Sequence, residues 1–392
     1  MPPPPHRVAE VFREGWEAYR REHCVAARCV TVVRHILACR TAALGGHLYR
    51  CDICGTELPL YNSCRDRHCP TCQTLRKQRW LEQRRAEVLP VPYFHVVFTL
   101  PHALNALIAA NRARLLGELF GTVNWVLQHF AADPQWKLRG QIGFIAVLHT
   151  WTQRLTAHAH LHCLVAGGAW NEAEGVWRSA HRRYLFGKDA LAVAFQARFI
   201  RRIQSLRQRG KLRFEGEYAA PLAESAAWDA LIRRLWQTKW IVYPKATAKN
   251  PEQALDYLAR YTHRVAISDH RILAVGNGEV TFAWRDRTDG NRAKTLTIPL
   301  ADFIGRFLLH VLPRGFQKVR AYGWLAPRRK TAVLAAIRVH LGVLPPPAPV
   351  PADETPASRI LRLTGVDVTR CPSCAGHLDY IAQLPRSRDG PT

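Results

Sequence analysis

Residues 157–165 read Ala-His-Ala-His-Leu-His-Cys-Leu-Val, with Gly167-Gly168 shortly after them. Polar and apolar residues alternate along this stretch, which is typical of a strand with one buried face. On such a strand, His160 and His162 share one face, and the apolar residues between and after them share the other. We expect the strand to end at the glycine pair.

The two histidines on this face predict a metal site, because imidazoles at positions i and i+2 of a strand converge readily on one cation. His158 faces the same way, but at about 3.3 Å per residue it is roughly 13 Å from His162, too far to share an ion directly. A third ligand should come from elsewhere, and His149 is a candidate if the apolar run 142–148 is the neighbouring strand. The alternative is that these histidines are surface polar residues of an ordinary strand.

The composition predicts a polyanionic partner. The 392 residues include 56 Lys and Arg against 30 Asp and Glu, a formal charge of +26. Twelve Trp and eleven Tyr add surfaces on which bases can stack. No apolar run has the length of a membrane span, and the proline-rich start is unlike a signal peptide. We therefore expect a cytoplasmic, nucleoid-associated bacterial protein, without a membrane partner, whose eleven Cys are thiols or metal ligands.

Two Cys-x2-Cys pairs lie in the N-terminal part, Cys51 with Cys54 and Cys69 with Cys72, with fourteen residues between them. This spacing is typical of a zinc ion held tetrahedrally by four thiolates, so we expect one structural zinc on these four cysteines. Many Arg and Lys residues surround the pairs, which favours a role in nucleic-acid binding over a purely structural one.

The other cysteines leave alternatives open. Cys64 and His68 lie between the two pairs, so a changed ligand set or a second ion stays open. Cys371 and Cys374 form one further pair, which cannot close a tetrahedral site alone, and its metal status is left open. Three more cysteines lack ligand spacing and are expected to be small core residues: Cys24, Cys29 and Cys39.

The order of elements predicts an α+β fold on an antiparallel sheet. Strands are expected at 93–100, 142–149 and 157–165, with a long helix at 102–130. Other helices are expected at 8–42, 74–89, 191–207, 222–239 and 302–311, and a hairpin at 280–298. Four domains follow: 1–90, helical and zinc-binding; 91–270, the core of the catalytic part; 271–343, a basic strand-helix extension; and 344–392, a Pro-rich linker and tail.

A second group of candidate residues lies on a helix expected from the capping signal Asn-Pro-Glu-Gln at 250–253 to about residue 266. Tyr257 and Tyr261 are one turn apart, and Arg264 lies on the same side, so the two hydroxyls can reach a common site. The alternative is that both tyrosines are aromatics at the edge of the core.

These features together resemble known motifs. Phe98-Thr99-Leu100-Pro101 resembles the first motif of rolling-circle replication initiators, His160-Leu161-His162 their His-hydrophobic-His motif, and Tyr257-x3-Tyr261 their tyrosine motif, in the same order. With the cysteine pairs and the strings at 93–101, 149–151, 158–168 and 257–268, the chain resembles the two-tyrosine transposases of the insertion-sequence ninety-one group over roughly residues 20–330. Ala159 departs from the Pro common there, but it faces away from the expected metal, so little effect is expected.

The resemblance implies a His-hydrophobic-His (HUH) endonuclease domain, like that of replication initiators and relaxases, preceded by a small helical zinc-knuckle domain. It implies Mg²⁺ or Mn²⁺ on His160 and His162, with His149 as third ligand because relaxases carry a His about ten residues before the pair, and Zn²⁺ in the N-terminal module. Tyr257 and Tyr261 would be nucleophiles that form a 5′-phosphotyrosine with single-stranded or melted element ends and transfer the strand to target DNA.

Basic residues near the tyrosines are expected to contact DNA phosphates; they are Lys249, Arg260 and Arg264. Two alternatives remain open. One is a plasmid replication initiator or relaxase with the same chemistry. The other is a zinc-dependent DNA-binding protein whose nuclease site is inactive. The cysteine pairs directly before the catalytic part favour the transposase.

Overall fold

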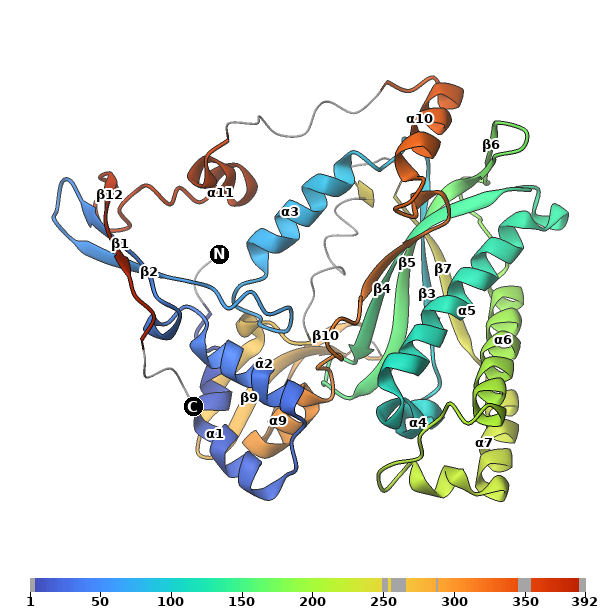
Figure 1. Cartoon of the computed structure of the whole chain (residues 1–392), viewed down its shortest axis with the longest axis horizontal. Coiled ribbons are helices and arrows are strands. Elements are labelled where there is room, and N and C mark those ends of the chain that lie inside the picture. Colours follow the sequence, from blue (N-terminus) through green and yellow to red (C-terminus); the bar gives the residue numbers. More distant parts are fainter. Residues whose placement is uncertain (1–3, 249–252, 255–265, 287, 345–353, 388–392) are drawn as a thin grey trace.

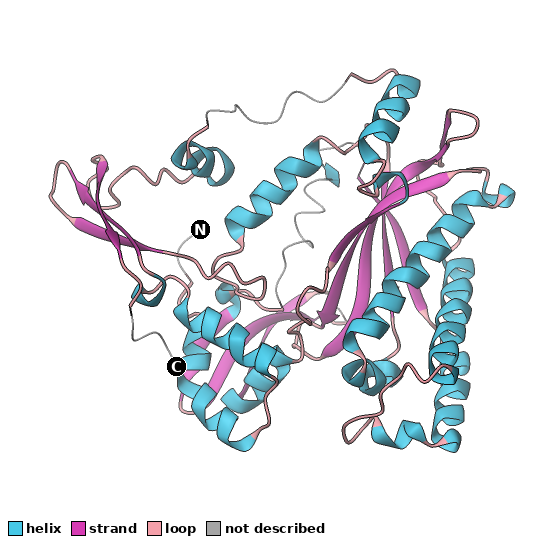
Figure 2. Cartoon of the chain, in the orientation of Figure 1, coloured by secondary structure: helices cyan, strands magenta, loops and turns pink. Residues whose placement is uncertain are grey.

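The computed structural model describes residues 4–248, 253–254, 266–286, 288–344 and 354–387 (Figures 1 and 2). Its centre is a six-stranded antiparallel sheet in the order β11-β4-β5-β3-β7, with β6 paired to β5. The expected α+β fold is therefore confirmed. The strands are β3 (Tyr93–Thr99), β4 (Gln141–Trp151), β5 (Ala157–Asn171), β6 (Val176–Ser179), β7 (Ile241–Ala248) and β11 (Val319–Tyr322).

Strand β5 does not end at the glycine pair, so that expectation is wrong. It continues to Asn171 and pairs there with β6. Instead of forming a turn, the two glycines let neighbouring segments approach the strand closely. A Cβ on Gly168 would lie 2.3 Å from the Trp177 ring, and one on Gly167 would lie 2.6 Å from the carbonyl oxygen of Pro92.

The two faces of the sheet differ in chemistry. Phe98, Leu161 and Cys163 lie on the apolar face, which packs against helices α5 (Arg112–Ala132) and α6 (Lys188–Gln208) (Figure 1). Helix α7 (Ser225–Gln237) extends this layer. The opposite face carries His149, His160 and His162 on β4 and β5. The predicted separation of polar and apolar faces along residues 157–165 is confirmed.

Two expected helices are each broken in two. The helix expected at 102–130 becomes α4 (Asn105–Ala110) and α5, because Asn111 leaves the helical ladder. The Asn111 side chain donates to the carbonyl of Arg213 (2.8 Å) and accepts from its N–H (2.8 Å), which ties the break to a distant loop. The helix expected at 8–42 becomes α1 (Val8–Glu22) and α2 (Ala27–Ala38).

A second core joins the N-terminal helices to residues far along the chain. Helix α1 packs against α9 (Leu300–Leu308), where the rings of Phe12 and Phe307 meet edge-on at 5.2 Å. Beneath them is a three-stranded sheet of β8 (Ile272–Gly276), β9 (Glu279–Asp286) and β10 (Arg292–Pro299), and its β9–β10 pair is the predicted hairpin.

A third, small sheet joins the two ends of the chain. Strand β1 (Gly46–Cys51) pairs with β2 (Glu57–Tyr61) on one side and with β12 (Leu378–Leu384) on the other. In the described part of the chain, the remaining α-helices are α3 (Thr74–Arg85), α10 (Lys330–Leu341) and α11 (Pro356–Thr364). Across the described residues, none of the helices has the length and apolarity needed to cross a bilayer.

Candidate functional site

Three histidines converge on the polar face of the central sheet. His149 on β4 lies directly opposite His160 on β5, and His162 follows two residues later on the same face. One ring nitrogen from each lies within 4.8 Å of the other two. His149 and His162 are buried and His160 is half-buried. The strand register therefore brings together the three residues that the sequence suggested.

Hydrogen bonds to two of these rings select the nitrogen that faces the centre of the group. His160 Nδ1 donates to the carbonyl oxygen of His158 at 2.9 Å. His162 Nδ1 lies 2.8 Å from Nε2 of His95, with the two rings stacked at 5.0 Å. Because both bonds use Nδ1, Nε2 is the nitrogen of each ring that could coordinate an ion. Such outer hydrogen bonds fix the tautomer and orientation of metal-binding histidines.

His95 is a candidate positioning residue that the sequence did not reveal. It lies on β3, which pairs with β5 on the side away from β4, and it is buried. Within the apolar run 93–100 a single histidine carries little signal. The signal that was present is its alternation with Val97 and Thr99, which places it on the histidine face once β3 is known to pair with β5.

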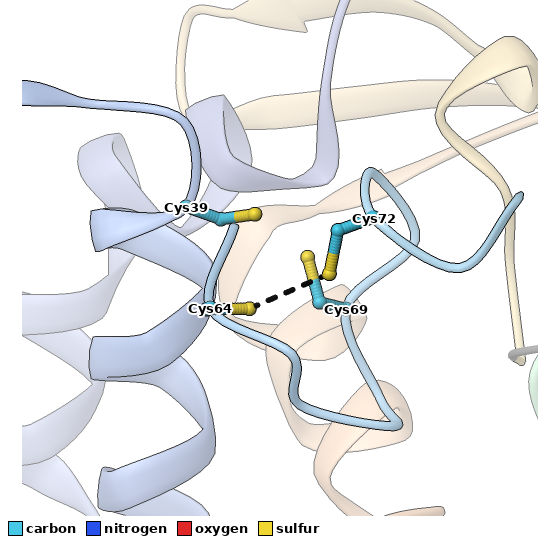
Figure 3. A group of neighbouring side chains, drawn as sticks. All are labelled: Cys39, Cys64, Cys69 and Cys72. Atoms are coloured by element: carbon cyan, nitrogen blue, oxygen red, sulfur yellow. Dashed lines mark hydrogen bonds between the residues drawn. The ribbon is translucent and has the colours of Figure 1, made fainter. Parts of the chain in front are cut away.

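Eight of the eleven cysteines form two groups of four, and the expected ligand set of Cys51, Cys54, Cys69 and Cys72 is wrong. Cys69 and Cys72 gather with Cys39 and Cys64 (Figure 3), whereas Cys51 and Cys54 gather with Cys371 and Cys374. The hairpin β1–β2 separates the two original pairs. It carries Cys51 and Cys54 to one end and returns the chain beside α2, where Arg40 N–H donates to the carbonyl of Asn62 at 3.1 Å.

We call Cys39, Cys64, Cys69 and Cys72 the first cysteine cluster. All four thiols lie within 4.8 Å of one another, and Sγ of Cys64 is 3.7 Å from Sγ of Cys72. Tetrahedral zinc with bonds of about 2.3 Å sets its sulfur ligands about 3.8 Å apart, so the group fits the ion. Cys39, expected to be only a small core residue, is thus one of the candidate ligands.

Asp66 organises the loop between these cysteines. Its buried carboxylate accepts hydrogen bonds from His35 Nδ1 (3.0 Å), Arg28 (3.2 Å) and the backbone N–H of His68 (2.9 Å). Burial alone would raise the pKa of Asp66, but the hydrogen bonds, led by that of His68, hold it well below its usual range. His68 is not in the cluster, because its Nε2 accepts from the N–H of Leu312 at 3.1 Å.

A basic groove of about 960 Å³ lies between this loop, helix α3 and residues 315–319. Its described lining includes no acidic residue. Burial, followed by the charges of Arg67 and Arg76, lowers the pKa of Lys318 to about 8. The basic lining residues are Arg40, Arg65, Arg67, Arg76, Arg79 and Lys318.

The groove adjoins the histidines. The carbonyl of Lys318 accepts from the N–H of Leu148, one residue before His149. Trp151, whose ring stacks on His149 at 4.5 Å, lines a small cavity together with Arg67 and Lys318. The other predicted residues lie outside the described part of the chain; they are Lys249, Tyr257, Arg260, Tyr261 and Arg264.

Comparison with known proteins assigns the family. A protein of Sinorhizobium fredii named "Putative transposase y4qJ" is 43% identical over 369 residues, which cover 94% of this chain and 92% of that protein. The transposase for insertion sequence element IS801 of Pseudomonas savastanoi pv. phaseolicola is 30% identical over 91% of this chain and 84% of its own. The chain belongs to the insertion-sequence ninety-one (IS91) family of transposases.

Two family models divide this IS91-family transposase. Residues 11–100 match a "Transposase zinc-binding domain", and residues 143–332 match a family described as "Putative transposase". The first range contains the whole first cysteine cluster, and together they support Zn²⁺ in the N-terminal module. The second range contains His149, His160 and His162. No solved structure matches the chain significantly.

Proposed function

We propose that this transposase cuts single-stranded DNA with a tyrosine nucleophile and transfers the cut strand by a rolling-circle-like mechanism. The convergence of His149, His160 and His162 on one face of an antiparallel sheet is the observation that carries the proposal. Three imidazoles, two of them oriented by hydrogen bonds through Nδ1, are a ligand set for one divalent cation, with positions left open for substrate oxygens.

The proposed cation is Mg²⁺ or Mn²⁺, held by Nε2 of His160 and His162 and by His149. When bound, such an ion polarises a scissile phosphate and neutralises its developing charge. The protein's own contribution is orientation. The β4–β5 register sets the spacing of the ligands, and the bonds to His95 and to the His158 carbonyl fix two of the rings.

The nucleophile in this proposal is the hydroxyl of Tyr257 or Tyr261. Its oxygen attacks phosphorus, a Tyr O–P bond forms, and the P–O3′ bond breaks. The proton lost by the tyrosine is balanced by the proton gained at the leaving 3′-oxygen. Because the phosphodiester energy is kept in the 5′-phosphotyrosine, a 3′-hydroxyl can reverse the step on another strand. Two tyrosines allow one cut at the element end and one at the target.

The basic groove is the proposed path of the DNA backbone. Its walls carry six cationic side chains, and its floor at Lys318 borders the strand that holds His149. Contacts of this kind release counterions, so binding should weaken steeply with salt. Arg65 and Arg67 lie on the loop of the first cysteine cluster. The zinc module would therefore contribute directly to DNA binding.

The test is incubation of the full chain with single-stranded DNA that bears the element's ends, in Mg²⁺ or Mn²⁺, followed by mass spectrometry of the protein–DNA adduct. We expect one adduct, absent in EDTA. His160→Ala should form none while still binding DNA. Tyr257→Phe and Tyr261→Phe should each still form one adduct but be impaired in complete transposition, and the double variant should form none.

Phe keeps the aromatic ring, so loss of the adduct would report the hydroxyl rather than unfolding. An adduct formed by the double Phe variant, or mapped to another residue, would refute the assignment of the tyrosines. Undiminished cutting in EDTA would refute the role of the cation. DNA binding without any adduct under all conditions would favour an inactive DNA-binding protein.

A further inference from the structure

We propose that Cys51, Cys54, Cys371 and Cys374 bind a second zinc ion, which fastens the C-terminal tail onto the N-terminal module. The inference is independent of the nuclease chemistry. The four sulfur atoms lie within 4.8 Å of one another. Sγ of Cys51 is 3.3 Å from that of Cys374, and Sγ of Cys54 is 3.8 Å from that of Cys371. These separations match four thiolates around one tetrahedral zinc, which sets its sulfurs about 3.8 Å apart.

The two Cys-x2-Cys segments form the same turn, although 317 residues separate Cys54 from Cys371. The carbonyl of Cys51 accepts from the N–H four residues later (3.1 Å), and the carbonyl of Cys371 does the same (2.9 Å). The N–H of Cys51 donates to the carbonyl five residues later (3.0 Å), and that of Cys371 again does the same (2.8 Å). Two matched turns that face each other are the usual frame of a four-cysteine zinc site.

The residue after each turn repeats as well. Gly55 has φ +68°, and Ala375, at the equivalent position, has φ +60°. Left-handed backbone is unfavourable for an alanine, so the surroundings hold Ala375 there. Gly376 lets the two turns approach, because a Cβ on it would lie 2.8 Å from Sγ of Cys51 and 2.7 Å from the Asp52 carboxylate.

The sheet around these turns has too small a core to hold the tail alone. Strand β12 pairs with β1, and Asp52 N–H donates to the carbonyl of His377 at 3.0 Å (Figure 1). Among the described residues, the buried members of this core are Cys51, Cys371 and Leu378, with the partly buried Tyr49 and Leu58 packed against them, and Tyr380 on β12 is 56% exposed. Units with so little apolar burial are ordinarily stabilised by a metal or a disulfide.

The second zinc site would also position helix α11, which lies between residues 345–353 and Cys371. Arg362 on α11 forms an ion pair with Glu82 on α3. Its Nε also donates a hydrogen bond to the carboxylate of Glu354 (2.6 Å). Helix α3 lines the basic groove through Arg76 and Arg79. The second zinc would therefore fix the tail against the side of the module that carries the groove.

The experiment measures zinc in the full chain purified under reducing conditions. We expect two zinc ions per chain, and one in the double variant Cys371→Ser/Cys374→Ser. Cys24→Ser, an exposed cysteine outside both groups, should keep two. Ala375→Gly, which retains all ligands and suits the left-handed backbone, should also keep two. In the double variant, amide exchange in 378–384 should speed up about tenfold or more, while the β5 amides stay protected.

A second measurement does not depend on the folding of any variant. Chelated wild-type protein titrated with Co²⁺ should develop thiolate-to-cobalt absorption up to two equivalents. One zinc in the wild type, two in the double variant, or a cobalt end point at one equivalent would overturn the proposal. So would disulfides among these four cysteines in the freshly purified protein, found by mass spectrometry without reduction.

Discussion

The histidine cluster and the first cysteine cluster are held in place by different parts of the structure. His149, His160 and His162 lie on two central strands whose hydrogen-bonded ladder runs from Gln141 opposite Trp170 to Trp151 opposite Ala157. Cys64, Cys69 and Cys72 lie instead in residues 62–73, which form neither helix nor strand. The sheet positions the histidines before any ion binds. The cysteine loop relies on its ligand to close, so metal binding there is part of folding.

The largest effect should come from removing one ligand of each kind. Cys64→Ser should abolish zinc binding at the first cluster and lower the stability of the N-terminal module by about 3 kcal/mol or more, because structural zinc contributes on the order of 10 kcal/mol to such modules. His160→Ala, at a half-buried strand position, should change stability by about 1 kcal/mol or less. Denaturant unfolding and zinc content measure both, with Cys24→Ser as control.

Two results would refute this difference between the sites. One is that His160→Ala unfolds the chain as readily as Cys64→Ser, and the other is that Cys64→Ser keeps its zinc and its unfolding midpoint. The first result would mean that the ion, not the sheet, organises both sites. The second would mean that the ion organises neither.

The same contrast explains what the sequence could predict. The period of two along residues 157–165 fixes which side chains share a face, and a neighbouring strand supplies His149. The grouping of the cysteines depends on which distant segments meet. Nothing local in Cys51-x2-Cys54 shows that its partner pair lies beyond residue 370, beside a strand that joins β1. His95 and Asn111 were missed for the same reason, since each acts through a contact between segments.

A histidine outside the cluster offers a second test, through pH. His310 is buried with its Nε2 donating to the carbonyl of Leu155 (3.0 Å) and its Nδ1 3.2 Å from the hydroxyl of Thr150. Both nitrogens are satisfied in the neutral ring, and burial is the main cause that lowers the pKa of His310 to about 4. The unfolded chain, with an ordinary pKa near 6.5, takes up the proton first, so stability is lost as pH falls from about 6.5 to 4.

Because of His310, the free energy of unfolding should fall by about 2 kcal/mol from pH 7 to pH 5. Unfolding midpoints at the two pH values measure the loss, and His310→Gln should reduce the difference by that amount. An equal pH dependence in both proteins would show that His310 is not the group responsible. The result would separate a structural histidine that contacts Thr150 near the end of β4 from the clustered histidines on β4 and β5.

The smallest effect concerns His95, which contacts the histidine cluster without joining it. His95→Gln should lower cation-dependent cutting about tenfold at limiting Mn²⁺, because partners of metal-binding histidines tune ligand orientation, and Gln still offers a hydrogen-bonding group to His162. A positioning role predicts that higher Mn²⁺ restores the rate, since the loss lies in affinity for the ion. A purely structural role predicts the same loss at every Mn²⁺ concentration, together with a lower unfolding midpoint. His129→Gln, on helix α5 across the sheet, should leave the Mn²⁺ dependence unchanged. If His95→Gln behaves like that control, the stacked pair of His95 and His162 contributes only to packing, and the sheet alone orients the ligands.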